Sequence, residues 1–86
     1  MARVLLTRTA GEALAALDVL RADAVLDALG ELEHDPFLGH DLRGRLTGLR
    51  SYRVGVYRIP YELRDDRTVH VVAIRHRDIA NDTDPR

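Results

Sequence analysis

The apolar residues of this chain change their spacing once, near residue 49, and that change limits the folds open to it. Before it, apolar side chains recur every three to four residues, which is the period of an amphipathic helix. After it, they alternate with polar side chains, which is the period of a half-buried strand. Helices followed by strands predict an α+β architecture rather than alternating βαβ units.

Two helices are expected in the first part, after a short strand over residues 2–6. Thr7 or Thr9 is a suitable N-cap for the first helix, because a threonine hydroxyl can accept from a backbone N–H of the first turn. The second helix is predicted from about Leu20 to His34. It ends before Pro36, because the residue preceding a proline resists the α region. Its apolar stripe consists of Ala22, Val25, Leu26, Leu29 and Leu32.

Three strands are expected in the second part. Gly55-Val56 fits a two-residue hairpin loop, with glycine at the first central position of a type II′ turn. Arg64 to Arg67 forms a second turn, and Thr68 to Ile74 is a third β-rich run. The predicted order is β-α-α-β-β-β, a two-helix hairpin packed on a curved antiparallel sheet of about four strands. All 86 residues are interpreted as one domain, with residues 82–86 as a frayed tail.

The first loop fixes which residues of the hairpin face each other. Val54 pairs with Tyr57, and Arg53 pairs with Arg58 on the same sheet face. Like charges directly opposite each other destabilise a sheet. A sheet selected only for stability would avoid this pair, so the arginines indicate a functional surface.

The second loop decides which residues join them. A two-residue loop at Asp65-Asp66 places Ala73 beside Arg58. Arg75 follows on the same face, and Arg77 joins it if the strand continues. The opposite face then packs under the helices through Tyr52, Ile59, Tyr61, Val72 and Ile74.

Two interpretations of this arginine face remain open from the residues alone. Several converging guanidinium groups form a good phosphate clamp, because each offers a planar fork of donors. Alternatively, the face is simply solvated, and its charges are satisfied by Glu62, Asp78 or water.

The charge of the chain is unevenly distributed. The formal net charge is −1, yet residues 1–41 carry three arginines against eight acids, and residues 42–86 carry ten arginines against six acids. Residues 42–61 hold five arginines and no acid. Such a basic segment can attract phosphate even in a nearly neutral protein.

Composition excludes several other kinds of site. The chain has no cysteine, so disulfides and thiolate–metal sites are excluded, and we expect no cofactor. His34, His40, His70 and His76 lack a metal-ligand spacing and are expected to have structural or surface roles. All 13 basic residues are arginine, so no lysine can serve as a general base. No apolar run approaches the ~20 residues needed to span a bilayer, so a cytoplasmic location is expected.

Nearly the whole chain resembles one protein family, the RelE/ParE toxins of bacterial toxin–antitoxin systems. The specific features are Leu42, Gly44, Leu46, Gly48, Leu49, Arg53-Val54-Gly55, Tyr57-Arg58 and Tyr61. The last strand and its basic end, from Val71 to Asp78, are also similar to the family. The short first strand, the threonine-capped helix and a second helix ending at Asp35-Pro36 agree with it.

The resemblance implies a toxin that cleaves mRNA in the ribosomal A site, inhibiting translation. RelE-type members position the message with basic side chains and promote attack of a 2′-OH on the adjacent phosphate. The corresponding catalytic residues here are Arg53, Arg58 and Arg77, and His76 is the nearby candidate for proton transfer. Arg43, Arg45, Arg50 and Arg75 are the candidate RNA-binding residues.

Two departures from the family pattern keep other functions open. Family members often carry a catalytic tyrosine near the position that Asn81 occupies here. Pro60 removes a backbone donor from a strand that is expected to be interior. One alternative is a ParE-like protein that inhibits DNA gyrase without chemistry of its own. Another is a degenerate toxin that only binds its antitoxin. The expected partners are an antitoxin with acidic residues over the arginine face, together with the ribosome and mRNA or, alternatively, gyrase.

Overall fold

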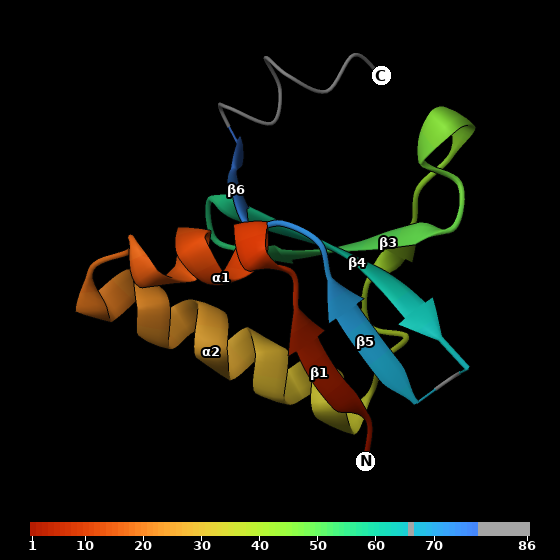
Figure 1. Cartoon of the computed structure of the whole chain (residues 1–86), viewed down its shortest axis with the longest axis horizontal. Coiled ribbons are helices and arrows are strands. Elements are labelled where there is room, and N and C mark those ends of the chain that lie inside the picture. The colour runs from red at the N-terminus through yellow and green to blue at the C-terminus, as the bar shows by residue number, and fades with distance from the viewer. Residues whose placement is uncertain (66, 78–86) are drawn as a thin grey trace.

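Two helices cover one face of a six-stranded sheet in the computed structural model, which describes residues 1–65 and 67–77 (Figure 1). The sheet order is β1-β5-β4-β3-β2, and β6 also pairs with β4. The elements are β1 (Arg3–Leu6), α1 (Arg8–Ala15), α2 (Val19–His34), β2 (His40–Asp41), the 3₁₀ helix η1 (Gly44–Leu46), β3 (Leu49–Val54), β4 (Tyr57–Arg64), β5 (Thr68–Val71) and β6 (Arg75–His76). The predicted α+β fold is therefore confirmed, with the short strands β2 and β6 added to it.

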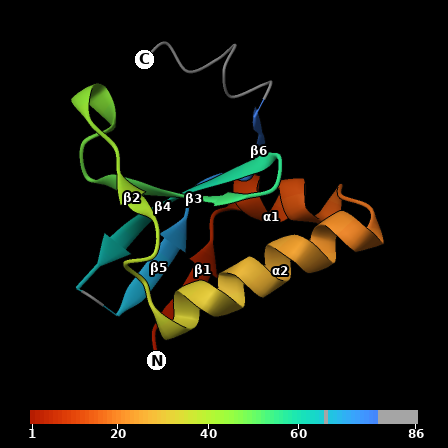
Figure 2. The same cartoon turned by 180° about the vertical axis from the view of Figure 1, so that it is seen from behind.

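The sheet is mixed, because β1 pairs in parallel with β5 while all other pairs are antiparallel. In both views, α2 lies below β3 and β4, and the loop that contains η1 rises above these strands together with β6 (Figures 1 and 2). One sheet face is thus occupied by the core. No helix within the described ranges is long and apolar enough to cross a membrane.

Each helix begins at a side-chain cap. The hydroxyl of Thr7 accepts from the backbone N–H of Ala10 at 3.1 Å, which selects Thr7 over Thr9 as the cap of α1. Asp18 caps α2 by accepting from the backbone N–H of Arg21 at 2.9 Å, and this hydrogen bond holds the pKa of Asp18 below its usual value. Because these caps satisfy N–H groups that have no partner within the helix, they fix where both helices start.

The core forms between α2 and the inner face of β4 and β5. Ile59, Tyr61, Val69 and Val71 are completely buried there. The predicted stripe of α2 is correct at Val25, Leu29 and Leu32 but wrong at Leu26, which is 50% exposed. Ala28, which is 3% exposed, is buried in place of Leu26. On the sheet, Val69 and Val71 take the place predicted for Val72.

Pro60 lies where β4 changes partners. Residues 61–64 of β4 pair with β5, and residues 57–58 pair with β6. Val72 donates its backbone N–H to the carbonyl of Pro60 at 3.0 Å. A regular ladder would return a bond from residue 60 to the Val72 carbonyl, but proline has no N–H. The hydroxyl of Thr7 donates to that carbonyl at 2.9 Å instead, so the missing bond is replaced.

The change of partner also shifts the register by one residue. Tyr61 pairs with Val71, and Arg58 pairs with Arg75, so three residues, 72–74, face only two residues of β4. The insertion has the two-against-one offset of a β-bulge. The prediction that Ala73 lies beside Arg58 is wrong by two residues, because Arg64 pairs with Thr68 rather than with residue 67 and the insertion then adds one more residue. The shift buries Ile74, which is 8% exposed, and leaves Arg75 on the open face.

Candidate functional site

Three arginines form a row across the open face of the sheet. Arg53 on β3 pairs with Arg58 on β4, as the hairpin register predicts, and Arg58 pairs with Arg75 on β6. Gly55 has φ +56°, and Val56 has no positive φ, as the predicted type II′ turn requires. We call Arg53, Arg58 and Arg75 the arginine row. The three arginines thus come from three strands, and the first and last of them, Arg53 and Arg75, lie 22 residues apart in the sequence.

Glu62, one of the two acids considered as partners of the arginine face, does not form an ion pair with the row. Glu62 instead accepts from Arg64 at 2.7 Å. Arg53 and Arg75 form no ion pair with any acid in residues 1–65 and 67–77. Asp78, the other acid considered for this role, lies outside the described residues. Because directly opposed like charges repel, an anion that bridges the row would remove an unfavourable interaction.

A small pocket opens beside the row. Its volume is about 150 Å³, and its lining consists of His40, Leu42, Ser51, Arg53 and Arg58. This volume is below the ~300 Å³ of sites that enclose a whole small molecule. The pocket therefore suits one group of a larger ligand, such as a phosphate within a chain.

His76 lies away from the arginine row. It pairs with Tyr57 on β4, one position from Arg58, and successive residues of a strand point to opposite faces. Its ring meets the Tyr57 ring edge-on, with centroids 5.5 Å apart and planes at 82°. The structure therefore does not bring the histidine predicted for proton transfer to the predicted phosphate surface.

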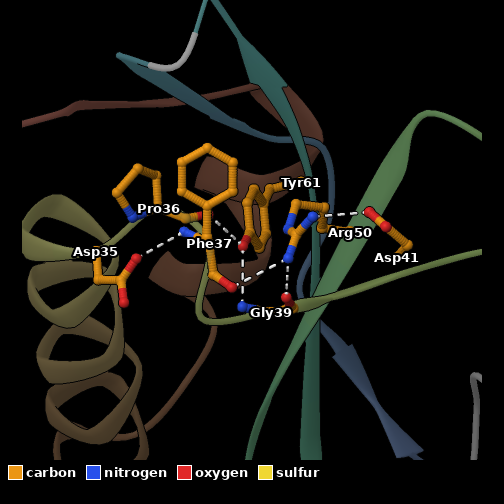
Figure 3. Close-up of polar contacts among 7 residues, drawn as sticks. All are labelled: Asp35, Pro36, Phe37, Gly39, Asp41, Arg50 and Tyr61. Carbon is orange, nitrogen blue, oxygen red and sulfur yellow. Dashed lines mark hydrogen bonds and ion pairs between the residues drawn. The ribbon is translucent and has the colours of Figure 1, made fainter.

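Arg50 is also separate from the row, because it pairs with Asp41 on the other face of β3. Its side chain is only 19% exposed and forms an ion pair with Asp41 at 2.7 Å. It also donates to the carbonyls of Phe37 (3.0 Å) and Gly39 and lies over the Phe37 ring at 5.5 Å (Figure 3). These contacts engage both terminal nitrogens of the guanidinium, so we assign Arg50 to holding the segment before β2 rather than to binding RNA.

The remaining predicted basic residues lie at the margins of the row. Arg43 and Arg45 are exposed in the loop around η1, which rises on the open side of the sheet (Figures 1 and 2). Arg77 is exposed and follows β6 directly, and its backbone N–H donates to the Val56 carbonyl at 2.6 Å. Asn81 lies outside the described residues. Within the described part of the chain, no cluster of histidines and acids is arranged to hold a metal ion.

Comparisons with known proteins agree with this architecture. The sequence model of the ParE toxin of the type II toxin–antitoxin system parDE matches residues 4–80. No curated protein matches the sequence. Among solved structures, a chain of the RelBE2 toxin–antitoxin complex from Mycobacterium tuberculosis is 35% identical, with a TM-score of 0.80. That match covers 88% of this chain and 98% of the other.

More distant structures share the fold. The intact RelBE complex of E. coli is 18% identical with a TM-score of 0.75, and the match covers 88% of this chain and 96% of the other. The chromosomal ParDE system of P. aeruginosa is 14% identical with a TM-score of 0.71 and the same coverage. Helices packed on a mixed sheet in this order are thus a fold of small toxins. The chain belongs to the RelE/ParE family and is a toxin of a type II toxin–antitoxin system.

Proposed function

We propose that this toxin is a ribosome-dependent mRNA endoribonuclease and that the arginine row holds the phosphate at which the message is cut. The arginine row carries the proposal. A phosphodiester in the transition state of cleavage gains negative charge on its oxygens, and fixed guanidinium groups stabilise that charge. The 35% identity to a chain of the Mycobacterium tuberculosis RelBE2 complex supports a RelE-type activity.

Basic residues on both sides of the row also support a longer RNA-binding surface. Arg43 and Arg45 lie beyond one side of the row, and Arg77 follows Arg75 on the other. Contacts from these residues to neighbouring phosphates would position the message without reading its sequence. Binding should weaken steeply with salt, because each neutralised phosphate releases counterions.

We infer that the partner in the cell is an antitoxin. Solved relatives from Mycobacterium tuberculosis and E. coli are toxin–antitoxin complexes. An acidic antitoxin segment over the arginine row would relieve the repulsion between the arginines and block the RNA at the same time. An antitoxin complex that leaves Arg53 and Arg58 open, and that added salt does not weaken, would contradict this assignment.

The test is to add the purified toxin to a translating extract and to map the ends of the mRNA. We expect cuts in the codon occupying the ribosomal A site. Arg58→Ala and Arg77→Ala should each reduce cutting strongly. Arg8→Ala is the matched control, because the Arg8 side chain is 91% exposed on α1 and pairs with Glu12 of the same helix. Normal cleavage by both Arg58→Ala and Arg77→Ala would remove the proposed site.

A second candidate function is inhibition of DNA gyrase without chemistry. It is favoured by the match to the ParE sequence model and by the absence of any tyrosine after Tyr61. In this case the arginine face would bind a protein or DNA surface. Inhibition of gyrase supercoiling, together with uncut mRNA in the extract, would establish this function in place of the first.

A further inference from the structure

The arginine row has no side chain that exchanges a proton near neutral pH. Attack of a 2′-OH requires removal of its proton, and arginine stays protonated at its pKa of ~12.5 or more. We propose that His40 supplies this step, acting as the general base that takes the proton of the attacking 2′-OH. The proposal rests on the RNA-cleaving function proposed above.

The register of the sheet places His40 on the face of the arginine row. His40 on β2 pairs with Ser51 on β3, and Arg53 lies two residues further along β3 on the same face. Such diagonal neighbours are about 7–8 Å apart in an antiparallel pair, within reach of long side chains. Arg53, Arg58 and Arg75 therefore lie directly opposite one another on three adjacent strands, and His40 lies one diagonal step from Arg53 on the fourth.

The pockets of the structure meet at His40. It lines the pocket of about 150 Å³ that also contains Arg53 and Arg58. It also lines an adjoining pocket of about 430 Å³, together with Asp41, Leu42, Arg43 and Gly44. The imidazole is exposed, so it is accessible to a bound RNA chain. A phosphate on Arg53 and Arg58 would thus leave the adjacent ribose beside His40.

The residues on either side of His40 are held by polar contacts, which reach the backbone of Gly39 and the carboxylate of Asp41 (Figure 3). The buried hydroxyl of Tyr61 donates to the Pro36 carbonyl at 2.7 Å and accepts from the Gly39 N–H at 3.1 Å. Arg50 binds the Gly39 carbonyl on one side of His40 and the Asp41 carboxylate on the other. Such fixed backbone is the support that a catalytic side chain requires, because small displacements cost large factors in rate.

Gly39 has no room for a larger residue. A Cβ there would lie 2.8 Å from the Ser51 carbonyl oxygen and from the Tyr61 ring. The glycine lets the chain pass this close to β3 and β4 immediately before His40. The position of His40 is therefore set by packing beneath it as well as by hydrogen bonds.

The other histidines are poorly placed for the same role. His34 ends α2, and His70 has only 22% of its side chain exposed and lies 4.0 Å from Glu62. His76 packs against Tyr57 on the other face. The charged groups that share the two pockets with His40 are Arg53, Arg58, Arg43 and Asp41. The carboxylate of Asp41 is engaged by Arg50, so His40 is the side chain of this site that can accept a proton from a bound ribose.

The reaction then balances as follows. An imidazole nitrogen of His40 accepts the proton of the ribose 2′-OH as the O2′–P bond forms. The P–O5′ bond breaks, and the departing 5′ oxygen takes a proton from water. Arg53 and Arg58 stabilise the charge on the non-bridging oxygens. The products are a 2′,3′-cyclic phosphate on the upstream fragment and a 5′-OH on the downstream fragment.

The experiment uses purified ribosomes programmed with a defined mRNA and measures single-turnover cleavage at several pH values. General base catalysis is worth about 10²–10⁴-fold, so His40→Gln and His40→Ala should cleave at least about 100-fold more slowly. The wild-type rate should rise with pH to a plateau, because a general base must be unprotonated to act, and the variants should lose this rise. Added imidazole should restore part of the rate of His40→Ala. His34→Gln is the matched control and should cleave normally.

Thermal melting of each variant checks that it is folded. Binding of a short RNA with a 2′-deoxy residue at the cleavage position, which cannot be cut there, measures phosphate binding by the arginine row separately from cleavage. Normal cleavage by both His40 variants, with an unchanged pH profile, would overturn the role of His40 while the nuclease function stands. A slow His40→Ala variant with no imidazole rescue and an unchanged pH profile would also overturn it. Uncut mRNA with the wild-type toxin would refute the proposed function itself, and the role of His40 with it.

Discussion

The hydroxyl of Tyr61 should contribute more to stability than any other hydroxyl of the sheet, and Tyr61→Phe tests this. The ring is completely buried, and its hydroxyl serves two backbone groups of the segment before β2. Phenylalanine fills the same space but leaves the Gly39 N–H and the Pro36 carbonyl without this partner. Each hydrogen bond contributes about 1 kcal/mol net, and a buried group left unpaired costs about 1–3 kcal/mol. We therefore expect a loss of about 2–3 kcal/mol.

The loss is measurable by urea unfolding and by thermal melting. For a domain of this size, about 1 kcal/mol corresponds to about 4–8 °C in Tm, so Tyr61→Phe should lower Tm by about 10–20 °C. The control is Tyr52→Phe. Tyr52 donates to Glu31 at 2.6 Å near the surface, where such a bond contributes about 1 kcal/mol or less. If Tyr61→Phe costs no more than Tyr52→Phe, the argument that Tyr61 fixes this segment is refuted.

Three further predictions follow from the caps and charges. Arg53→Gln should raise the free energy of unfolding by about 0.5 kcal/mol at low salt and by less at about 0.5 M salt, since it removes one of two directly opposed cations. A decrease in stability at low salt would contradict this. Thr7→Val should lower the free energy of unfolding by about 1–2 kcal/mol, because it removes both the cap of α1 and the hydrogen bond to the Val72 carbonyl. Thr9→Val should lower it little, and equal losses for the two variants in urea unfolding would contradict this prediction. The hydrogen bond to the Glu31 carboxylate raises the pKa of Tyr52 above the usual value. The contribution of this hydrogen bond to the free energy of unfolding is therefore complete below about pH 10 and is lost as pH rises further. Tyr52→Phe should therefore flatten the decline of stability above about pH 10, in a chain that has no lysine titrating there.

Local signals were sufficient for most of the fold. The threonine cap, the proline after α2 and the glycine of the hairpin loop act on neighbouring residues, so the sequence alone predicts them. The opposition of Arg53 and Arg58 follows from the loop length in the same way. Arg75 was correctly assigned to the face of Arg58, although the predicted register had Ala73 beside Arg58.

The parts that could not be predicted depend on distant residues. The offset at residues 72–74 depends on the missing N–H of Pro60 and on the hydroxyl of Thr7, which lies 65 residues from Val72. His40 gave no signal because β2 has only two residues and no alternating pattern. Its face is defined only by pairing with β3. Gly39, the residue before His40, could have indicated a fixed segment. It is the one glycine among the described residues at which an added Cβ would lie within 4 Å of atoms other than those of its chain neighbours.

The offset at residues 72–74 has an evolutionary consequence. Whether Arg75 or Ile74 faces the open side depends on one extra residue, since a shift of one position turns every side chain of a strand to the other face. A substitution of Pro60 that restored the backbone N–H and closed the offset would retain all 13 arginines, both helices and the hairpin. It would nevertheless replace a cation of the row with an isoleucine. A lineage under pressure to disarm this toxin therefore has a route that leaves its composition and its apparent family membership almost unchanged.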